Sequence, residues 1–382
     1  MPTDSRPHVL HLRVVAGTGG GPEKTILNSP RFIRNEGIEA SVAYLCPPRD
    51  SIGESLRTRA SEADCPLHVL EDRGPLDLSL IFRVVKLCRN LKVDILQTHD
   101  YKSNALAWFV RKFYRVRLVT MLHGWTDLSG RMPLYKRIDQ LVLPLFESLI
   151  CVSPDLIEEC KRLRIAEDRL HLVHNAIDTT HFRRQYETRT AKEKLQANPD
   201  RFLIGSVGRL SKEKGFDRLI QAVAELQQQG FPVDLWIAGD GPERSRLSDT
   251  IDRYGCQKSI RLLGQLTDLR LLYQAMDLFV LNSTREGLPN VLLEAMALQT
   301  PAIATQVGGI SDLITPGKTG LLIAPENDGQ LSEAIRIVFN NPAYLQDMAT
   351  AARQHIEGNF SFDVRMKKIA HIYRTLLHSP PL

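Results

Sequence analysis

Two basic residues and a helix start in the second half of the chain could bind an anion together. Arg209 and Lys214 come just after an apolar, strand-like run. Pro289 precedes an apolar, helix-like segment, and we expect it at the first helical position, with the free amides of Asn290 and Val291 beside it. Cations and helix N-terminal amides that lie together at one edge of a sheet are typical of a phosphate or diphosphate site. The spacing therefore predicts an anionic ligand.

Two carboxylates accompany these cations. Glu286 lies before the expected helix and Glu294 about one and a half turns inside it. Phosphate would repel both, so we expect them to face hydroxyl groups at opposite ends of one elongated ligand. A ligand that consists of a sugar, a diphosphate and a nucleoside has this arrangement, with hydroxyl groups at both ends and the diphosphate in the middle. The chain shows no Asp-x-Asp pair, so we expect no bound metal and no cofactor.

The elements that must position these residues alternate between strand and helix along the whole second half. We expect a polar linker at 178–200, few of whose residues are large and apolar. After it the expected strands are 201–208, 233–239, 260–264, 278–283, 301–305 and 319–325. The expected helices are 216–229, 242–254, 289–298, roughly 329–356 and 361–377.

The first half shows the same alternation. Its expected strands are 8–15, 40–45, 94–99, 117–124 and 148–153, with an amphipathic helix at 76–91. Alternation of this kind is typical of βαβ units and parallel sheets. At 382 residues the chain is too long for one ordinary core. The sequence therefore predicts an α/β protein with two doubly wound, Rossmann-like domains that face a cleft.

A glycine-rich stretch, "GTGGGP", follows the first expected strand, where ligands bind in such sheets. Gly19 and Gly20 would let the backbone come close to a ligand. Ser41 stands where a dinucleotide fingerprint needs an acidic residue, so this fingerprint is not present. A tight strand–helix turn without a ligand is the alternative interpretation.

Composition and charge indicate which partners and which cell compartment to expect. Apolar residues make up 43% and the formal net charge is +5, which is too mild for a nucleic-acid binder. Residues 101–200 hold 17 Lys and Arg against 12 Asp and Glu, a surplus that favours an anionic membrane surface. The six cysteines show no metal-binding spacing, and we expect reduced thiols in the core. The first 15 residues lack the pattern of a secretory signal, so we expect a cytoplasmic protein.

Several of these segments together resemble the retaining glycosyltransferase family four, whose members have the GT-B fold. The segments are "GRLSKEKG", "EGLPNVLLEAMA" with its E-x7-E spacing, "GDGPE", "HNAID", "VGGISDLITPGKTGLLIAP", "THD", "HGWTD" and "GTGGGPEKT". They run through nearly the whole chain in the family's order. The resemblance implies an N-terminal domain at 1–185, a nucleotide-sugar domain at 186–360, and a C-terminal helix at 361–382 that crosses back to the first domain.

The same resemblance implies roles for individual residues. Arg209 and Lys214 would hold the diphosphate, Glu286 the transferred sugar and Glu294 the ribose, while His123 would lie at the reacting centre. The remaining donor-side candidates are Gly19, Gly20, Asn175, Gly239, Asp240, Gly287, Leu288, Pro289, Asn290 and Val291. The acceptor-side candidates are His99, Asp100, Trp125 and Asp127. Trp125 stands where the family often has a threonine.

The implied reaction is a metal-independent transfer, with retention, of a sugar from a nucleotide diphosphate sugar. A UDP-sugar is the donor most common in the family. A glycan or lipid-linked acceptor fits the basic first half, and residues 108–119, "WFVRKFYRVRLV", could lie on a membrane surface as a basic aromatic helix. A solvated basic face is the alternative for this segment. Two other functions stay open: a sugar-nucleotide epimerase of the same fold, and a nucleotide-sugar-binding protein without turnover.

Structural roles also stay open for the site candidates. Glu294 could be a buried helix acid satisfied by nearby groups, and Arg209 and Lys214 could be solvated surface charges. His123 could be an ordinary core histidine. His99 and Asp100 could serve structural hydrogen bonding as well as they could line a cleft.

Overall fold

The computed structural model describes residues 6–15, 21–48, 52–74, 77–123 and 132–380. The chain forms two compact units: Met1–Asn175 with Phe362–Leu382, and Ala176–Ser361. Residues 176–185, which we assigned to the first domain, group with the second unit. The last helix groups with the first unit, as the resemblance predicts.

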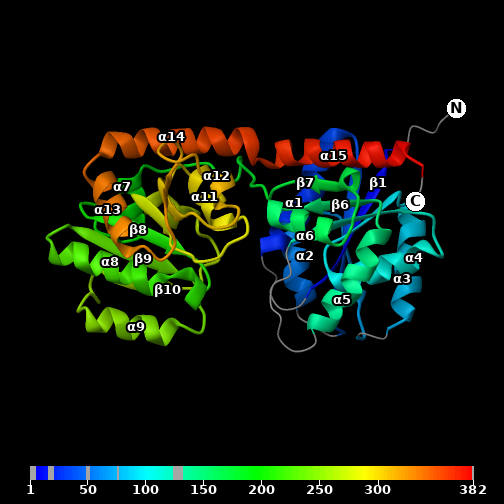
Figure 1. Ribbon diagram of the computed structural model, residues 1–382, viewed down its shortest axis with the longest axis horizontal. Coiled ribbons are helices and arrows are strands. Elements are labelled where there is room, and N and C mark those ends of the chain that lie inside the picture. The colour runs from blue at the N-terminus through cyan, green and yellow to red at the C-terminus, as the bar shows by residue number, and fades with distance from the viewer. Residues whose placement is uncertain (1–5, 16–20, 49–51, 75–76, 124–131, 381–382) are drawn as a thin grey trace. The chain divides into compact units, whose positions relative to one another are not determined.

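The first unit is built on a parallel sheet (Figure 1). Among its described residues the strand order is β3-β2-β1-β4-β5-β6-β7. The strands are β1 (His8–Val14), β2 (Glu39–Cys46), β3 (Leu67–Glu71), β4 (Ile95–Thr98), β5 (Arg117–Leu122), β6 (Ser148–Cys151) and β7 (Leu170–Leu172). The order reverses between β1 and β4, so a ligand is expected beyond the carboxyl ends of these two strands.

Helices connect the strands of this sheet. They are α1 (Gly21–Ile33), α2 (Ile52–Glu62), α3 (Ser79–Leu91), α4 (Tyr101–Arg111), α5 (Met132–Val142), α6 (Pro154–Arg162) and α15 (Phe362–His378). Short 3-10 turns are η1 (Arg34–Glu36), η2 (Leu143–Leu145) and η3 (Glu167–Arg169). α15 packs against α1, where Phe362 stacks on Phe32 with 4.9 Å between ring centroids. The C-terminal helix is therefore part of the first unit's fold.

The second unit repeats the plan with the strand order β10-β9-β8-β11-β12-β13 over its described residues. The strands are β8 (Phe202–Val207), β9 (Val233–Ala238), β10 (Ile260–Gly264), β11 (Leu278–Leu281), β12 (Ala302–Thr305) and β13 (Leu321–Ile323). Successive residues of β11 enter different cores: Phe279 and Leu281 join one, Leu278 and Val280 the other. Both faces of the sheet are therefore covered, as in a doubly wound fold.

The helices of the second unit supply these two cores. They are α7 (Thr188–Lys194), α8 (Phe216–Gln228), α9 (Arg244–Arg253), α10 (Arg270–Ala275), α11 (Asn290–Ala297), α12 (Ile310–Leu313), α13 (Asp328–Phe339) and α14 (Pro342–Asn359), with the 3-10 turn η4 (Lys212–Lys214). The order of strands reverses between β8 and β11, and the residues expected to bind the donor follow these two strands.

The structure corrects two further expectations. The linker at 178–200 contains α7, whose buried Lys192 forms an ion pair with Asp277 at 2.5 Å. The single helix expected at 329–356 is two helices, because Pro342 starts a new one and cannot continue the old. All six cysteines are buried with free thiols, as expected. No described helix has the length and apolarity needed to cross a membrane.

Candidate functional site

Three histidines from three strands of the first unit form one hydrogen-bonded stack. His11 lies in β1, His99 follows β4 and His123 follows β5. The Nδ1 atom of His11 is 3.0 Å from Nε2 of His99, and Nδ1 of His99 is 3.2 Å from Nε2 of His123. The ring centroids are 5.3 and 5.5 Å apart, with planes 23° and 24° from parallel. We call this stack the histidine chain.

The surroundings keep the histidine chain uncharged. Burial lowers the pKa of His11 and that of His123 to about 3, and lowers the pKa of His99 well below its usual value. The guanidinium of Arg365, from α15, adds to each of these shifts. Arg365 is 3% exposed and donates to the carbonyl oxygen of His174 at 2.6 Å. A buried cation therefore opposes protonation of the chain.

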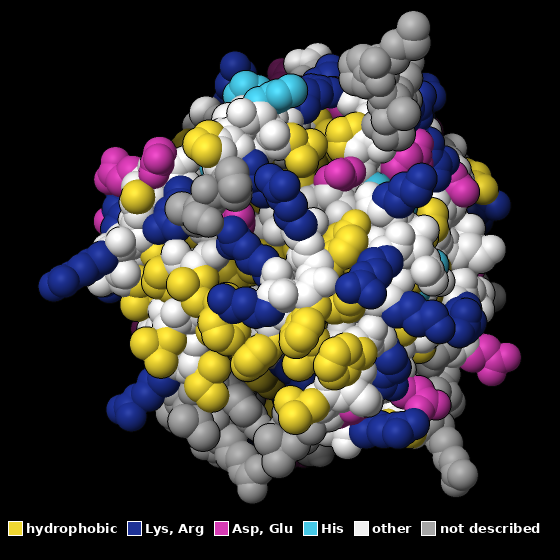
Figure 2. Space-filling view, turned by 90° about the vertical axis from the view of Figure 1, so that its right-hand side faces the viewer, with side chains coloured by type: hydrophobic (Ala, Val, Ile, Leu, Met, Phe, Trp, Pro, Cys, Tyr) yellow, Lys and Arg dark blue, Asp and Glu magenta, His cyan; other side chains and the backbone are white. Residues whose placement is uncertain are grey.

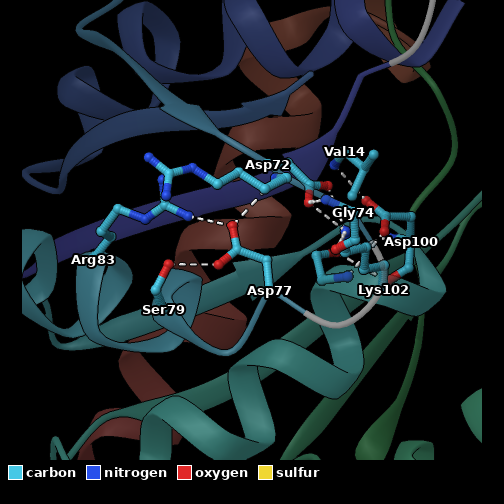
Figure 3. Close-up of polar contacts among 10 residues, drawn as sticks. Val14, Asp72, Gly74, Asp77, Ser79, Arg83, Asp100 and Lys102 are labelled. Atoms are coloured by element: carbon cyan, nitrogen blue, oxygen red, sulfur yellow. Dashed lines mark hydrogen bonds and ion pairs between the residues drawn. The ribbon is translucent and has the colours of Figure 1, made fainter. Parts of the chain in front are cut away.

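Asp100 has a structural role in the described geometry (Figure 3). One carboxylate oxygen accepts the backbone N–H of Val14 at 2.8 Å, and the other accepts the N–H of Ser103 at 2.9 Å as the N-cap of α4. Burial raises the pKa of Asp100, and these hydrogen bonds oppose the rise. The residue therefore ties the end of β1 to the start of α4. Gly19, Gly20, Trp125 and Asp127 lie outside the described residues.

In the second unit, the loops that follow β8 and β11 are bound to each other. The N–H of Thr284 donates to the carbonyl of Glu213 at 2.8 Å, and the side-chain amide of Asn282 donates to the carbonyl of Gly215 at 3.2 Å. On this frame Lys214 Nζ lies 2.6 Å from Oε1 of Glu286. The cation and the carboxylate expected at the donor site therefore meet at the point where the strand order reverses.

The Glu286 carboxylate has a second partner. The hydroxyl of Ser283 donates to the same Oε1 atom at 2.6 Å. The side chain of Glu286 is 10% exposed and that of Lys214 is 19% exposed. The pair is thus largely shielded from water, and its geometry is held by short contacts rather than by solvent.

Two glycines allow neighbouring segments to lie close against these loops. Gly239 has φ +140°, and a Cβ there would lie 1.8 Å from the carbonyl oxygen of Gly208. Gly308 has φ +51°, and a Cβ would lie 1.9 Å from the carbonyl oxygen of Glu286. A side chain at Gly239 would therefore press on the loop after β8, which carries Lys214, and one at Gly308 would press on the loop after β11, which carries Glu286.

Glu294 is a buried residue of α11. It is 4% exposed, and its Oε2 accepts the hydroxyl of Tyr273 at 3.1 Å. Burial and the nearby Glu294 charge raise the pKa of Tyr273, so this phenol stays a donor. Pro289 is the N-cap of α11 and not its first residue, because its ψ of 118° is extended. Asn290 and Val291 therefore become the first two helical residues, and their amides have no acceptor within the helix.

The other donor-side candidates differ in exposure. Arg209 is exposed and has no acidic partner among the residues that the structure describes, and Asp240 is exposed with its carboxylate bound to the N–H of Gly241 at 2.8 Å. Gly287 is exposed, and Leu288 is buried. Asn175, the last residue before the second unit, has a buried Oδ1 without a hydrogen-bond partner in the described chain.

Sequence reasoning missed four of these residues: His11, Arg365, Ser283 and Tyr273. His11 was the one with a signal, since a histidine within an apolar strand is a buried polar group that needs a partner. The others act through contacts between distant segments that spacing does not reveal.

Comparison with known proteins decides the family. Residues 19–181 match the family model "Glycosyltransferase Family 4", and residues 187–355 match "Glycosyl transferases group 1". TuaC of Bacillus subtilis (strain 168), a glycosyltransferase named for teichuronic acid biosynthesis, is 31% identical over 300 residues, which cover 75% of this chain and 72% of that protein. The chain belongs to glycosyltransferase family four.

Other relatives extend the likeness over most of the chain. LpsD of Rhizobium meliloti (strain 1021), a lipopolysaccharide core biosynthesis glycosyltransferase, is 25% identical over 354 residues, 92% of this chain and 94% of its own. The crystal structure of Anabaena Alr3699/HepE in complex with UDP matches with a TM-score of 0.81, 20% identity and coverage of 96% and 99% of the two chains. This glycosyltransferase therefore has the GT-B fold and two parallel-sheet α/β domains.

Proposed function

We propose that this retaining glycosyltransferase takes its sugar from a nucleoside diphosphate sugar, most simply a UDP-sugar, held by the loops after β8 and β11. The observation that carries the proposal is the shielded contact of 2.6 Å between Lys214 and Glu286 where the strand order of the second unit reverses. The Anabaena structure of the same fold, described as a complex with UDP, supports this choice of donor.

Each charged group of the site matches one part of the donor: the cations match the diphosphate, and the carboxylates match hydroxyl groups. Lys214 has three N–H donors, of which one reaches Glu286, so two remain for phosphate oxygens. The exposed guanidinium of Arg209 and the first amides of α11 are the other groups that favour negative charge. Glu286 and Glu294 accept hydroxyl groups of the transferred sugar and of the ribose. We propose Asn175, Gly239, Asp240, Gly287 and Leu288 as further donor contacts.

These groups also stabilise the leaving group. Transfer breaks the bond between the anomeric carbon and the diphosphate oxygen, and a new bond forms to the acceptor oxygen on the same face of the sugar. The acceptor's proton passes to the departing diphosphate. Lys214, Arg209 and the helix amides neutralise the growing negative charge, so we propose that no metal takes part.

The donor proposal is tested by mixing the protein with a panel of nucleotide sugars. We expect one or more UDP-sugars to raise the melting temperature and to release UDP when an acceptor is present. An epimeric nucleotide sugar formed without acceptor would instead indicate an epimerase. Binding without turnover for every donor and acceptor tried would indicate a binding protein.

We propose a glycan or lipid-linked acceptor, used by a protein that binds at an anionic membrane surface. LpsD and TuaC, named for lipopolysaccharide core and teichuronic acid biosynthesis, support a role in polysaccharide synthesis. The first unit supplies the surface. Figure 2 shows apolar side chains gathered on one face of the molecule with Lys and Arg side chains among and around them.

Exposed aromatic residues of α3, of α4 and of the turn after α4 form the centre of this surface, which we call the aromatic face. Phe82 is 60% exposed and Phe113 is 51% exposed, and their rings lie 5.4 Å apart. Leu78, Phe109 and Leu141 are exposed as well. A cluster of large, solvent-exposed apolar side chains on a folded protein is typical of a binding surface.

Exposed basic residues around the aromatic face favour an anionic partner. Four exposed basic residues have no acidic partner within the described part of the chain: Lys86, Lys112, Arg115 and Arg137. Each such residue near an anionic lipid surface contributes about 1 kcal/mol of attraction. Two contributions would strengthen attachment to the membrane: apolar rings that enter the headgroup region, and cations that bind lipid phosphates.

Co-sedimentation with vesicles tests this part of the proposal. We expect binding to vesicles that contain phosphatidylglycerol, weaker binding in high salt, and little binding to neutral vesicles. Phe82→Ser with Phe113→Ser should lower the bound fraction at least about tenfold, because it removes two exposed rings that would enter the headgroup region. Ile337→Ser, at a residue of α13 that is 48% exposed, is the matched control and should bind as before. Equal binding of the two variants would contradict the role of the aromatic face.

A further inference from the structure

The histidine chain restricts the protons that its three rings can carry. Each uncharged imidazole has one N–H and one acceptor nitrogen. Both ring nitrogens of His99 are occupied, by Nδ1 of His11 and Nε2 of His123. Two hydrogen bonds among three uncharged rings allow only two arrangements: all three protons on Nδ1, or all three on Nε2. The tautomer of His123 is therefore set by the whole chain.

The chain has a free nitrogen at each end. Nδ1 of His123 and Nε2 of His11 have no hydrogen-bond partner among the described residues, and neither belongs to the fully buried unpaired atoms. In the first arrangement His123 offers an N–H at its free end. In the second it offers a lone pair. The two arrangements thus differ in what the protein presents to a substrate.

Nearby charges favour the first arrangement. Of the charges that face His11, the guanidinium of Arg365 has the largest effect. The cation that most affects His123 is Arg13, whose Nε lies 2.9 Å from the carboxylate of Glu23 and is partly neutralised by it, and Arg365 has a smaller effect there. A positive charge beside His11 stabilises a lone pair on its free nitrogen. This charge favours the arrangement in which the protons lie on Nδ1 throughout the chain.

We propose that His11 and His99 are positioning residues that hold His123 as an uncharged imidazole with its proton on Nδ1, so that this N–H donates to an oxygen atom of the bound substrate. The catalytic part of this inference rests on the proposed function, together with the place at the reacting centre that the family resemblance implies for His123. Arg365, carried by the C-terminal helix, sets the direction of the chain. His99 then acts through His123 and does not contact the acceptor itself.

Long-range ¹H–¹⁵N correlation spectra of protein with ¹⁵N-labelled histidine test the arrangement directly. We expect His11, His99 and His123 all to carry the proton on Nδ1 at neutral pH, although a free histidine side chain favours Nε2. His123→Ala identifies the His123 signals. Signals of an imidazolium, or a proton on Nε2 of His123, would overturn the proposal. This spectrum requires no substrate, so it is independent of whether the donor proposal holds.

Four variants separate a positioning role from a structural one. His99→Phe keeps a ring in the stack but removes both hydrogen bonds, and His11→Phe removes only the first donor. His11→Asn places an amide N–H where Nδ1 lies and should keep the tautomer of His123. His8→Phe, on the same strand, loses a hydrogen bond of 2.8 Å to Ser41 but stands outside the chain, so it is the matched control.

We expect the two phenylalanine variants of the chain to move the His123 proton from Nδ1 and to lower kcat by roughly tenfold or more, with the donor KM unchanged. His11→Asn and His8→Phe should keep both the spectrum and kcat. If all four variants lose activity equally while the His123 spectrum stays constant, the residues serve folding alone and the proposal is wrong. If the spectra change as expected but the unaltered protein transfers no sugar, the donor proposal fails and the tautomer control stands.

Discussion

Replacing Lys214 with alanine should lower transfer far more than it lowers stability. In the proposed function, the ammonium group is one of the cations that meet the leaving diphosphate. Removal of one preorganised electrostatic contact typically lowers kcat by about 10²–10³, or roughly 2.7–4 kcal/mol. We therefore expect a loss of that size in kcat/KM for the best donor, measured as release of the nucleoside diphosphate.

The structure also gives the expected cost in stability. A fully buried ion pair that loses one partner costs about 3–5 kcal/mol. Here Lys214 is 19% exposed and Glu286 keeps the hydroxyl of Ser283, so we expect about 1–2 kcal/mol. In a unit of this size this lowers the melting temperature by roughly 2–8 °C, which calorimetry resolves.

Two further variants separate activity from stability. Lys212→Ala removes an exposed ammonium from the same 3-10 turn and should change neither quantity. Lys214→Ala with Glu286→Gln removes the uncompensated carboxylate, so the melting temperature should recover while transfer stays low. Recovery of transfer along with stability, or unchanged kcat/KM in folded Lys214→Ala, would refute the electrostatic role of this residue.

Three other outcomes follow from particular contacts. The histidine chain takes up protons in the unfolded state below about pH 6.5 but resists them in the folded state down to about pH 3, so stability falls as the pH falls through this window; urea unfolding at pH 7, 5.5 and 4.5 measures it. Gly239→Ala should cost about 3 kcal/mol or more in thermal unfolding because its Cβ would strike the Gly208 carbonyl, whereas Gly230→Ala, with a positive φ but open space, should cost about 1 kcal/mol. Asp100→Ala should cost about 2 kcal/mol through loss of a helix cap, and equal stability of this variant and the unaltered protein would contradict the capping role.

The central strands were predictable from the sequence because they are buried on both faces and read as apolar runs. The strands missed, β3 and β7, are the two edges of the first sheet, and most of their residues are half-exposed. The break between α13 and α14 had a readable signal in Pro342, since the residue before a proline avoids the helical conformation. Helix α7 had none, because its sequence is polar and its burial depends on the pairing of Lys192 with Asp277.

The candidate site, like the fold, was predictable from the sequence only in part. Arg209, Lys214, Glu286 and Glu294 could be chosen because they follow strand ends or lie at a helix start, where parallel sheets bind ligands. The contact between Lys214 and Glu286 could not, because it joins loops 72 residues apart. The histidine chain depends on the register of three strands, which the sequence does not reveal. Spacing therefore predicted which residues are candidates for the site, and side-chain packing decided how they are paired.

A crystal structure of the protein with UDP tests the central claim most directly. The account predicts the diphosphate within hydrogen-bond distance of Lys214 and of the first amides of α11, and the ribose hydroxyls at Glu294. UDP bound elsewhere, for example in the surface hollow beside Arg201, Lys258 and Arg261 at the opposite ends of the strands, would contradict it.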